Sequence, residues 1–282
     1  MSASSLCSVE TANETRLWRE FSSSVLTHLN EKFRHAQPFP HVSIDGLFSA
    51  DFLASVLEEA HVLPQTSWEP HYTALQKKRQ LNRWDAMPPA LLSYFTAVKS
   101  PDFIQFLEKL TGIAGLQPDI ELFGGGLHEA SQNGHFQIHV DFQKHPRTQK
   151  RNTLAVITYL NPDWQEEDEG SLELWNSSTE RPEAFIAPVF GRTLVMEQSP
   201  TALHGYPEPV KKGCRRALIA YFYTDNTDPD PLFEVQTTRY LRRSDIPLER
   251  RAQMFLREQL PQPMVTGMRK ACSRFLHYFK DK

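Results

Sequence analysis

His139 and Asp141 lie two positions apart in residues 134–142, a segment in which polar and apolar residues alternate. Residues two apart on a β-strand point to the same face, so one imidazole and one carboxylate aim at a common point. His204, much further along the chain, can add a second imidazole from another strand. Two histidines and one carboxylate form a ligand set that holds Fe(II) and leaves positions open opposite them. The sequence therefore predicts a metal site.

The strand that carries this pair has two chemically different faces. One face carries His135, Gln137, His139 and Asp141, and the other carries Phe136, Ile138, Val140 and Phe142. The apolar face is predicted to pack into a core, and the polar face to line a wet or metal-filled space. A surface strand would show the same pattern. We expect His135 and Gln137 to face the substrate, and the alternative is a hydrogen-bonded core pair.

Composition places the chain among ordinary globular proteins. It has 282 residues, 40% hydrophobic and 23% charged, and a net charge of −3. These values give no sign of binding to nucleic acid or an anionic membrane. The sequence contains no run of 18 apolar residues, so we expect no membrane span. The first residues lack the pattern of a secretory signal. Three widely spaced cysteines form no disulfide framework, so we expect a cytoplasmic protein.

Periodicity predicts helices before a long β region. Helices are expected over 14–35, 50–60, 88–98 and 101–111, and a short strand over 41–45. Residues 63–87 are polar and show no clear periodicity, which in a compact domain is often a functional loop. Strands are expected over 119–123, 126–130, 135–142, 152–160, 171–175, 184–187, 192–197 and 215–224. Basic amphipathic helices are expected over 244–259 and 264–280.

Eight successive β segments without helices between them predict an antiparallel sandwich or barrel. The fold class is thus mainly β with flanking helices. We divide the chain into an N-terminal segment and helix (1–39), a β domain (40–228) and a helical extension (229–282) that packs on the core. The basic helices of that extension could instead bind an acidic partner or dimerise, but buttressing the sheet is the favoured interpretation.

Further motifs follow the His-x-Asp pair in a characteristic order. They are Tyr159-Leu160-Asn161, Glu169-Gly170-Ser171, His204-Gly205-Tyr206 and Arg215-Arg216 before an apolar strand. This order resembles the prolyl-hydroxylase-like branch of the 2-oxoglutarate- and Fe(II)-dependent dioxygenases, over roughly 40–225 and most specifically over 124–224. The resemblance implies a double-stranded β-helix, or jelly roll. Glu169-Gly170 departs from the Gly-Gly that is frequent there, which we expect to affect only a turn.

The resemblance also implies roles for individual residues. His139, Asp141 and His204 match the Fe(II) ligands, and Arg215 matches the arginine that pairs with the distal carboxylate of 2-oxoglutarate. A guanidinium suits that role because it binds a carboxylate through two hydrogen bonds and stays charged when buried. Tyr159 matches a tyrosine that contacts the same carboxylate. Arg216 competes with Arg215, and the spacing to the following apolar strand favours Arg215.

The implied reaction couples oxidative decarboxylation of 2-oxoglutarate, with O₂, to hydroxylation of a C–H bond. The favoured substrate is a small molecule such as an amino acid or a biosynthetic intermediate, handled by a monomer or homodimer. The intact Asp141 argues against halogenation, whereas desaturation and cyclisation stay open. Two competing interpretations are a prolyl or peptidyl hydroxylase that acts on a protein and a non-catalytic jelly-roll binding module. Arg83 and Trp84 in the 63–87 segment are further candidate substrate contacts.

Overall fold

The computed structural model describes residues 17–227 and 230–242. Serine residues cap the N-termini of three of the described α-helices. The side chains of Ser22, Ser49 and Ser100 each accept a hydrogen bond from a backbone N–H in the first turn. The α-helices are α1 (Ser23–His35), α2 (Ala50–His61), α3 (Pro89–Val98) and α4 (Pro101–Thr111). Short 3₁₀ turns are η1 (Gln65–Ser67), η2 (Trp84–Ala86), η3 (Glu166–Asp168) and η4 (Pro231–Glu234).

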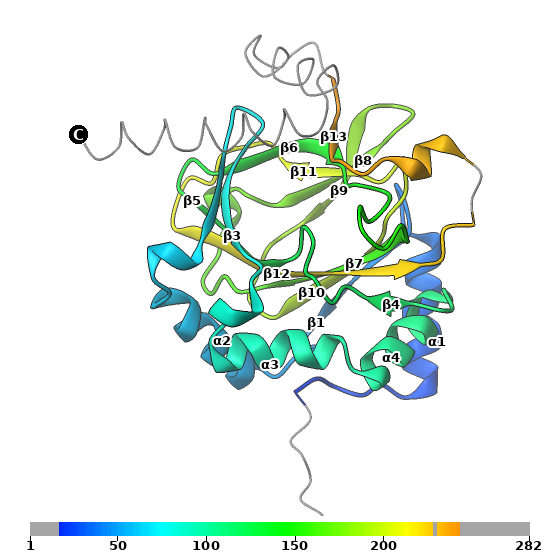
Figure 1. Cartoon of the computed structure of the whole chain (residues 1–282), viewed down its shortest axis with the longest axis horizontal. Coiled ribbons are helices and arrows are strands. Elements are labelled where there is room, and N and C mark those ends of the chain that lie inside the picture. Colours follow the sequence, from blue (N-terminus) through cyan, green and yellow to red (C-terminus); the bar gives the residue numbers. More distant parts are fainter. Residues whose placement is uncertain (1–16, 228–229, 243–282) are drawn as a thin grey trace, which may run out of the picture.

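The rest of the described chain is dominated by one antiparallel sheet that curls into a nearly closed barrel (Figure 1). Its strands are β1 (His41–Asp45), β2 (Glu69–Tyr72), β3 (Gln76–Leu81), β4 (Gln117–Pro118), β5 (Gly126–Ser131), β6 (His135–Val140), β7 (Arg151–Tyr159), β8 (Leu172–Asn176), β9 (Arg181–Ile186), β10 (Arg192–Glu197), β11 (Leu203–Tyr206), β12 (Cys214–Thr224) and β13 (Arg239–Tyr240). The main path runs β1-β10-β7-β12-β5-β3-β6-β11-β8-β9, and β2, β4 and β13 join it at β3, β12 and β6. This architecture is the predicted double-stranded β-helix.

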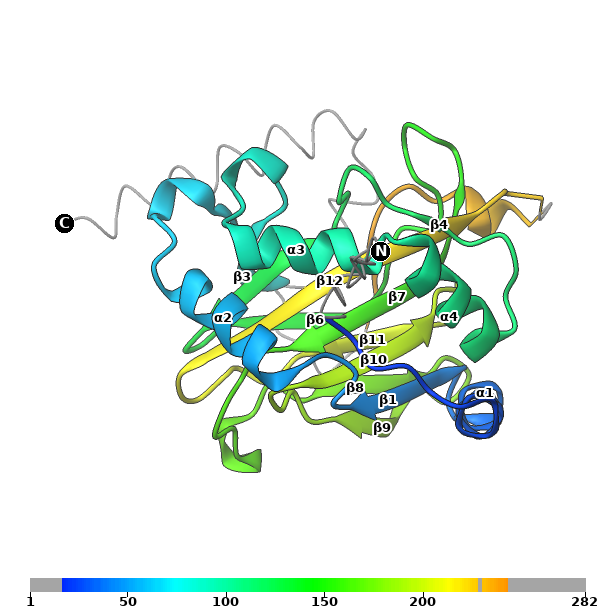
Figure 2. The same cartoon turned by 90° about the horizontal axis from the view of Figure 1, so that it is seen from below.

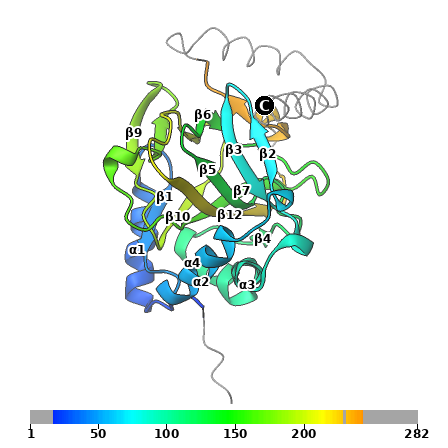
Figure 3. The ribbon, with the colours of Figure 1, turned by 90° about the vertical axis from the view of Figure 1, so that its left-hand side faces the viewer.

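Strand alternation divides the apolar residues between two cores. On β12, Leu218, Ala220 and Phe222 pack with the helices, whereas Ala217 and Tyr221 point into the barrel. Figure 2 shows α2, α3 and α4 on the outer face of the layer that contains β7 and β12, and Figure 3 shows the same arrangement from the side. The helices therefore support the strands from outside and leave the barrel interior for other groups.

The predicted elements before residue 112 are largely confirmed, as are seven of the eight predicted strands of the β region. The strand expected over 119–123 is wrong: Asp119 accepts hydrogen bonds from the backbone N–H groups of Glu121 and Phe123, which makes a turn. The segment 63–87 is not irregular, because it contains the β2–β3 hairpin. The helices predicted over 244–280 lie outside the described residues, and the domain limits stay predictions. Within the described ranges, no helix has the length and apolar character of a membrane span.

Candidate metal centre

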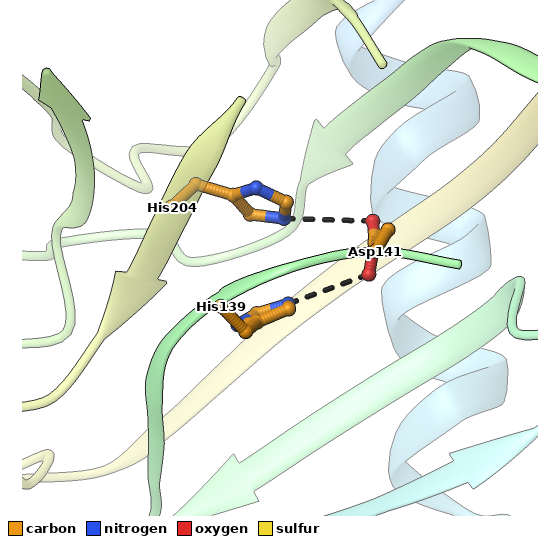
Figure 4. Close-up of side chains that lie close together, drawn as sticks. All are labelled: His139, Asp141 and His204. Atoms are coloured by element: carbon orange, nitrogen blue, oxygen red, sulfur yellow. Dashed lines mark ion pairs between the residues drawn. The ribbon is translucent and has the colours of Figure 1, made fainter. Parts of the chain in front are cut away.

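Three side chains from two neighbouring strands meet inside the barrel (Figure 4). His139 lies on β6, Asp141 follows at the end of that strand, and His204 on β11 pairs directly with His139. The Nε2 atom of His139 is 3.4 Å from Oδ1 of Asp141, and Nε2 of His204 is 3.5 Å from Oδ2. One ligand atom from each residue lies within 4.8 Å of the other two. These three residues could hold a metal ion.

The orientation of the two imidazoles fits that role. The Nδ1 atom of His139 is 2.7 Å from the carbonyl oxygen of Gln137, and Nδ1 of His204 is 2.9 Å from that of Ala202. A carbonyl can only accept, so both Nδ1 atoms carry the proton and both Nε2 lone pairs face the centre. In the described part of the chain, the buried Nε2 of His139 has no hydrogen-bond partner. The residues present therefore fit a divalent metal that binds imidazole and carboxylate.

Electrostatics favour the protonation states that a metal needs. Burial lowers the pKa of His139 to about 4, and His204 adds to this effect. Burial by itself would raise the pKa of Asp141, but the facing His204 and His139 outweigh it and hold that pKa well below its usual range. His139 is therefore neutral and Asp141 ionised at neutral pH.

A β-bulge in β6 makes the side chains of His135 and Gln137 point away from the face that the sequence predicted. His204 pairs with His139, and Tyr206 pairs with Phe136. The step between the two pairs is two residues on β11 but three residues on β6, so β6 contains one extra residue. The extra residue reverses the alternation, so Phe136 lines the cavity and its ring stacks on His139 at 3.8 Å between centroids. Gly205 opposes the bulge, where a Cβ atom would come within 2.8 Å of the Phe136 carbonyl oxygen.

The prediction that His135 and Gln137 face the substrate is consequently wrong. Both side chains lie near main-chain carbonyl oxygens: those of Asn133 and Ala74 for His135, and that of Pro207 for Gln137. Neither residue lines the cavity around the metal-binding groups. They match the alternative of a hydrogen-bonded core pair.

Arg215 and Arg216 have separate environments because adjacent side chains on β12 point to opposite faces. Arg215 is buried and lines the cavity, its Nε donates to the Gly170 carbonyl oxygen at 2.7 Å, and its Nη2 lies 3.4 Å from the Tyr159 hydroxyl. Among the described residues no carboxylate forms an ion pair with Arg215. Arg216 lies on the other face and donates to buried Glu129 at 2.7 Å. Because Gly170 anchors Arg215, the Glu169-Gly170 turn is closer to the chemistry than the sequence indicated.

The cavity that contains these groups has a volume of about 400 Å³. Its apolar walls include Ile157 and Leu172, and the β2–β3 hairpin supplies another wall with Gln76, Lys78 and Gln80. The 63–87 segment thus borders the cavity as predicted, but through different residues. Arg83 is exposed beside Asp85, and Trp84 donates its indole N–H to the Ile120 carbonyl oxygen, so neither candidate lines the cavity.

Sequence reasoning missed one residue beside the metal-binding groups. The hydroxyl of Tyr221, on β12, donates to Oδ2 of Asp141 at 2.7 Å, and both residues are buried. Tyr221 lies six positions after Arg215, an even number, so strand alternation from Arg215 was the available signal.

Comparison with known proteins agrees with this geometry. Residues 125–223 match the model of the 2OG-Fe(II) oxygenase superfamily. Over 200 residues the chain is 24% identical to prolyl 3-hydroxylase OGFOD1 from Xenopus laevis; the match covers 69% of this chain and spans 37% of the length of that relative. Two solved prolyl 4-hydroxylases share the fold. The Pseudomonas putida structure has a TM-score of 0.52 and 15% identity, covering 71% of this chain and 99% of that one. The Phytophthora capsici structure has a TM-score of 0.53 and 22% identity, covering 79% and 68%.

Residues 125–223, which contain all three metal-binding groups and Arg215, are therefore similar to the 2OG-Fe(II) oxygenase superfamily. The relative and the two solved structures named above are prolyl hydroxylases, and the matched superfamily implies Fe(II), 2-oxoglutarate and O₂ as cofactor and cosubstrates.

Proposed function

We propose that this protein hydroxylates a C–H bond, with His139, Asp141 and His204 as the Fe(II) ligands. The observation that carries the proposal is that these three groups share one cavity with a buried arginine, Arg215, that has no carboxylate partner among the described residues. Fe(II), when bound with 2-oxoglutarate and O₂, supplies the oxidation that yields succinate, CO₂ and the hydroxylated product. His139, Asp141 and His204 would hold Fe(II), and a set of only three protein ligands would leave positions for the cosubstrates.

Arg215 and Tyr159 are proposed to hold the distal carboxylate of 2-oxoglutarate. The guanidinium stays charged although it is buried, and its Cζ atom lies over the Tyr206 ring, 4.1 Å from the ring centroid. The hydrogen bond from Nε to the Gly170 carbonyl oxygen also restricts the orientation of the guanidinium and therefore of its remaining N–H groups. Ile157 and Leu172 line the same cavity and can shield the methylene groups of the cosubstrate.

Two substrate classes are candidates. The first is a small molecule such as an amino acid or a biosynthetic intermediate. The second is a prolyl residue of a peptide or protein, which is favoured by the similarity to prolyl hydroxylases. Desaturation or cyclisation would start from the same site. The monomeric or homodimeric state and the cytoplasmic location stay predictions.

Succinate release distinguishes these possibilities. We expect Fe(II)-loaded protein to convert 2-oxoglutarate to succinate slowly alone, and faster when a true substrate is added. Free amino acids form one arm of the assay and terminally blocked proline-containing peptides form the other, with mass spectrometry to detect a product heavier by one oxygen. A protein that binds iron yet releases no succinate in any arm would instead be a non-catalytic binding module.

Tyr221→Phe should weaken metal binding about 10- to 100-fold, because it removes a hydrogen bond that orients the proposed carboxylate ligand Asp141. Mn(II) titration of the apoprotein, followed by electron paramagnetic resonance, measures this change. Tyr223→Phe is the matched control, since the Tyr223 hydroxyl donates to Asp119 at 3.1 Å, away from the metal-binding groups. Equal metal affinities in the two variants would contradict this role for Tyr221.

A further inference from the structure

A segment that follows β12 returns to the strand that carries His139 (Figure 1, orange). It ends in β13, which pairs antiparallel with β6 and places Tyr240 opposite His139. One residue later, the Leu241 N–H donates to the Ile138 carbonyl oxygen at 2.9 Å. We call residues 231–241 the strap. At His139, β6 therefore has β11 on one edge and the strap on the other.

The strap has a second attachment beyond Asp141. The Val235 carbonyl oxygen accepts from the backbone N–H groups of Gln143 and Lys144, at 2.7 and 3.1 Å. The residue before it, Glu234, forms an ion pair with Lys144. The strap is therefore held on both sides of Asp141, by β13 on one side and by Val235 on the other.

Both attachments follow one antiparallel register. When the register of β13 is continued along the strap, Val235 falls opposite Lys144, and these two residues are hydrogen-bonded. In an antiparallel pair, every second residue exchanges backbone hydrogen bonds with the residue opposite it. Leu241 and Val235 are an even number of positions apart, so both belong to this alternating set. Between the two attachments, the hydrogen-bonded pair that this register requires would join Thr237 to Phe142.

That pair is open. Neither β6 nor β13 extends to it, and the backbone bends at Thr237. Among the described residues, no hydrogen bond joins Thr237 to Phe142. The buried Asn152 side chain donates to the Phe142 carbonyl oxygen at 3.0 Å instead, and the Gln143 side chain donates to the Asp141 carbonyl oxygen at 2.9 Å. The carbonyl groups on this side of the opening are therefore satisfied without the strap.

The opening belongs to the metal cavity. Thr237 and Phe142 line that cavity together with Asp141, and Gln236 and Thr238 line it on either side of Thr237. The backbone of a residue offers one N–H donor and one carbonyl acceptor. A secondary amide of a ligand has the same two groups, so it can pair with Thr237 where Phe142 does not. Extended peptides commonly bind to the edge of a sheet through such main-chain pairs.

We propose that this opening is a subsite for a secondary amide of the substrate, bound by the N–H and the carbonyl oxygen of Thr237. This inference rests on the proposed function. The subsite adjoins Asp141, so an amide held there brings the neighbouring C–H bonds of the substrate close to the metal-binding groups. Free amino acids have no secondary amide. The subsite therefore favours a peptide or an N-acylated amino acid amide over a free amino acid.

Probes that differ by one amide test the subsite. The full chain is loaded with 2-oxoglutarate and with Zn(II), a redox-inert substitute for iron, and binding is measured by calorimetry. One arm compares the terminally blocked peptide Ala-Pro-Ala-Ala with analogues in which one amide at a time is replaced by an ester. A second arm compares N-acetylproline methylamide with N-acetylproline methyl ester, and a third uses free amino acids. We expect one ester replacement to weaken binding about 2- to 12-fold, and the arm that shows this loss identifies the source of the amide.

Amide hydrogen exchange, followed by nuclear magnetic resonance, locates the contact within the strap. In wild-type protein, a saturating amide probe should slow exchange of the Thr237 N–H at least about tenfold. The Leu241 N–H is the internal control, because it already donates to Ile138 and should respond less.

Two variants separate the backbone of Thr237 from its side chain. Thr237→Pro removes the N–H and should weaken the amide probe about 2- to 12-fold. Thr237→Ala keeps the N–H, removes only the hydroxyl and methyl groups, and should bind the probe as the wild type does. The exchange measurement uses wild-type protein, so it stays decisive if Thr237→Pro does not fold.

The proposal is overturned if no amide-containing probe binds, if no ester replacement weakens binding, or if the probe leaves Thr237 exchange unchanged. It is also overturned if Thr237→Ala weakens the probe as much as Thr237→Pro, because the hydroxyl would then be the contact. Succinate release by the wild type without substrate tests the proposed function separately. A protein that turns over 2-oxoglutarate but fails these tests contradicts only the amide subsite.

Discussion

Asp141→Ala is expected to abolish both iron retention and conversion of 2-oxoglutarate to succinate. The substitution removes the only carboxylate of the three metal-binding groups and leaves two imidazoles. Loss of a residue that merely orients a ligand costs roughly 10- to 100-fold in metal affinity or activity, so loss of the ligand should cost more than about 100-fold. Thermal unfolding with and without Mn(II) gives a readout independent of turnover, because a ligand that binds only the folded state raises its stability. Wild-type protein should be stabilised by Mn(II), and the variant should not.

Asp141→Ala also removes the acceptor of the buried Tyr221 hydroxyl, so the apoprotein should lose about 1–3 kcal/mol in the free energy of unfolding. Asp119→Ala is the matched control. Asp119 is also buried and also accepts from a tyrosine of β12, but it caps the turn at Glu121 and Phe123. We expect that control to lose stability by about 1–3 kcal/mol while keeping its response to Mn(II). Retained Mn(II) stabilisation in Asp141→Ala would refute the proposed metal site.

Arg215→Met should weaken 2-oxoglutarate without weakening the metal. Hydrogen bonds to charged groups contribute about 1.5–3 kcal/mol each, which predicts a rise in the KM for 2-oxoglutarate of about 10- to 150-fold. Methionine is of similar length and stays compatible with the apolar neighbours Ile157 and Leu172. Succinate release against 2-oxoglutarate concentration measures the KM, and Mn(II) titration verifies that the metal site is intact.

Arg216→Met is the natural control, because it removes the same group one residue away and should give the opposite result. Arg216 pairs with buried Glu129, which keeps Arg79 as a second partner. We expect a loss of about 1–3 kcal/mol in the free energy of unfolding and an unchanged KM for 2-oxoglutarate. If Arg216→Met raised the KM and Arg215→Met did not, the assignment of the two arginines would have to be exchanged.

Much of the fold follows from local patterns. Apolar periodicity locates α2 and α4 closely, and alternation locates β7 and β12 within one residue at each end. Such patterns miss the β2–β3 hairpin because its residues are polar on both faces: one face binds Glu129 and the other lines the cavity. Its pairing with β5 and β6 joins residues far apart in sequence, so periodicity cannot report it. The short strand β11 has no local pattern either: a strand was expected to carry His204, but no strand range was predicted there.

The sequence by itself determined which groups could act: two histidines, one aspartate and an arginine in a set order, with His139 and Asp141 directed together by the period of a strand. Only the tertiary structure decided which neighbours share their cavity. The β6 bulge depends on pairing with β11, where Gly205 lies opposite it. The bulge places Phe136 beside His139 and turns His135 and Gln137 away from the cavity. Tyr221 on β12 and the polar residues of β3 likewise reach this cavity through the pairing of strands that are distant in sequence. Local periodicity fixes the face of a residue only until long-range pairing inserts a bulge, and it cannot determine which distant strand lies opposite.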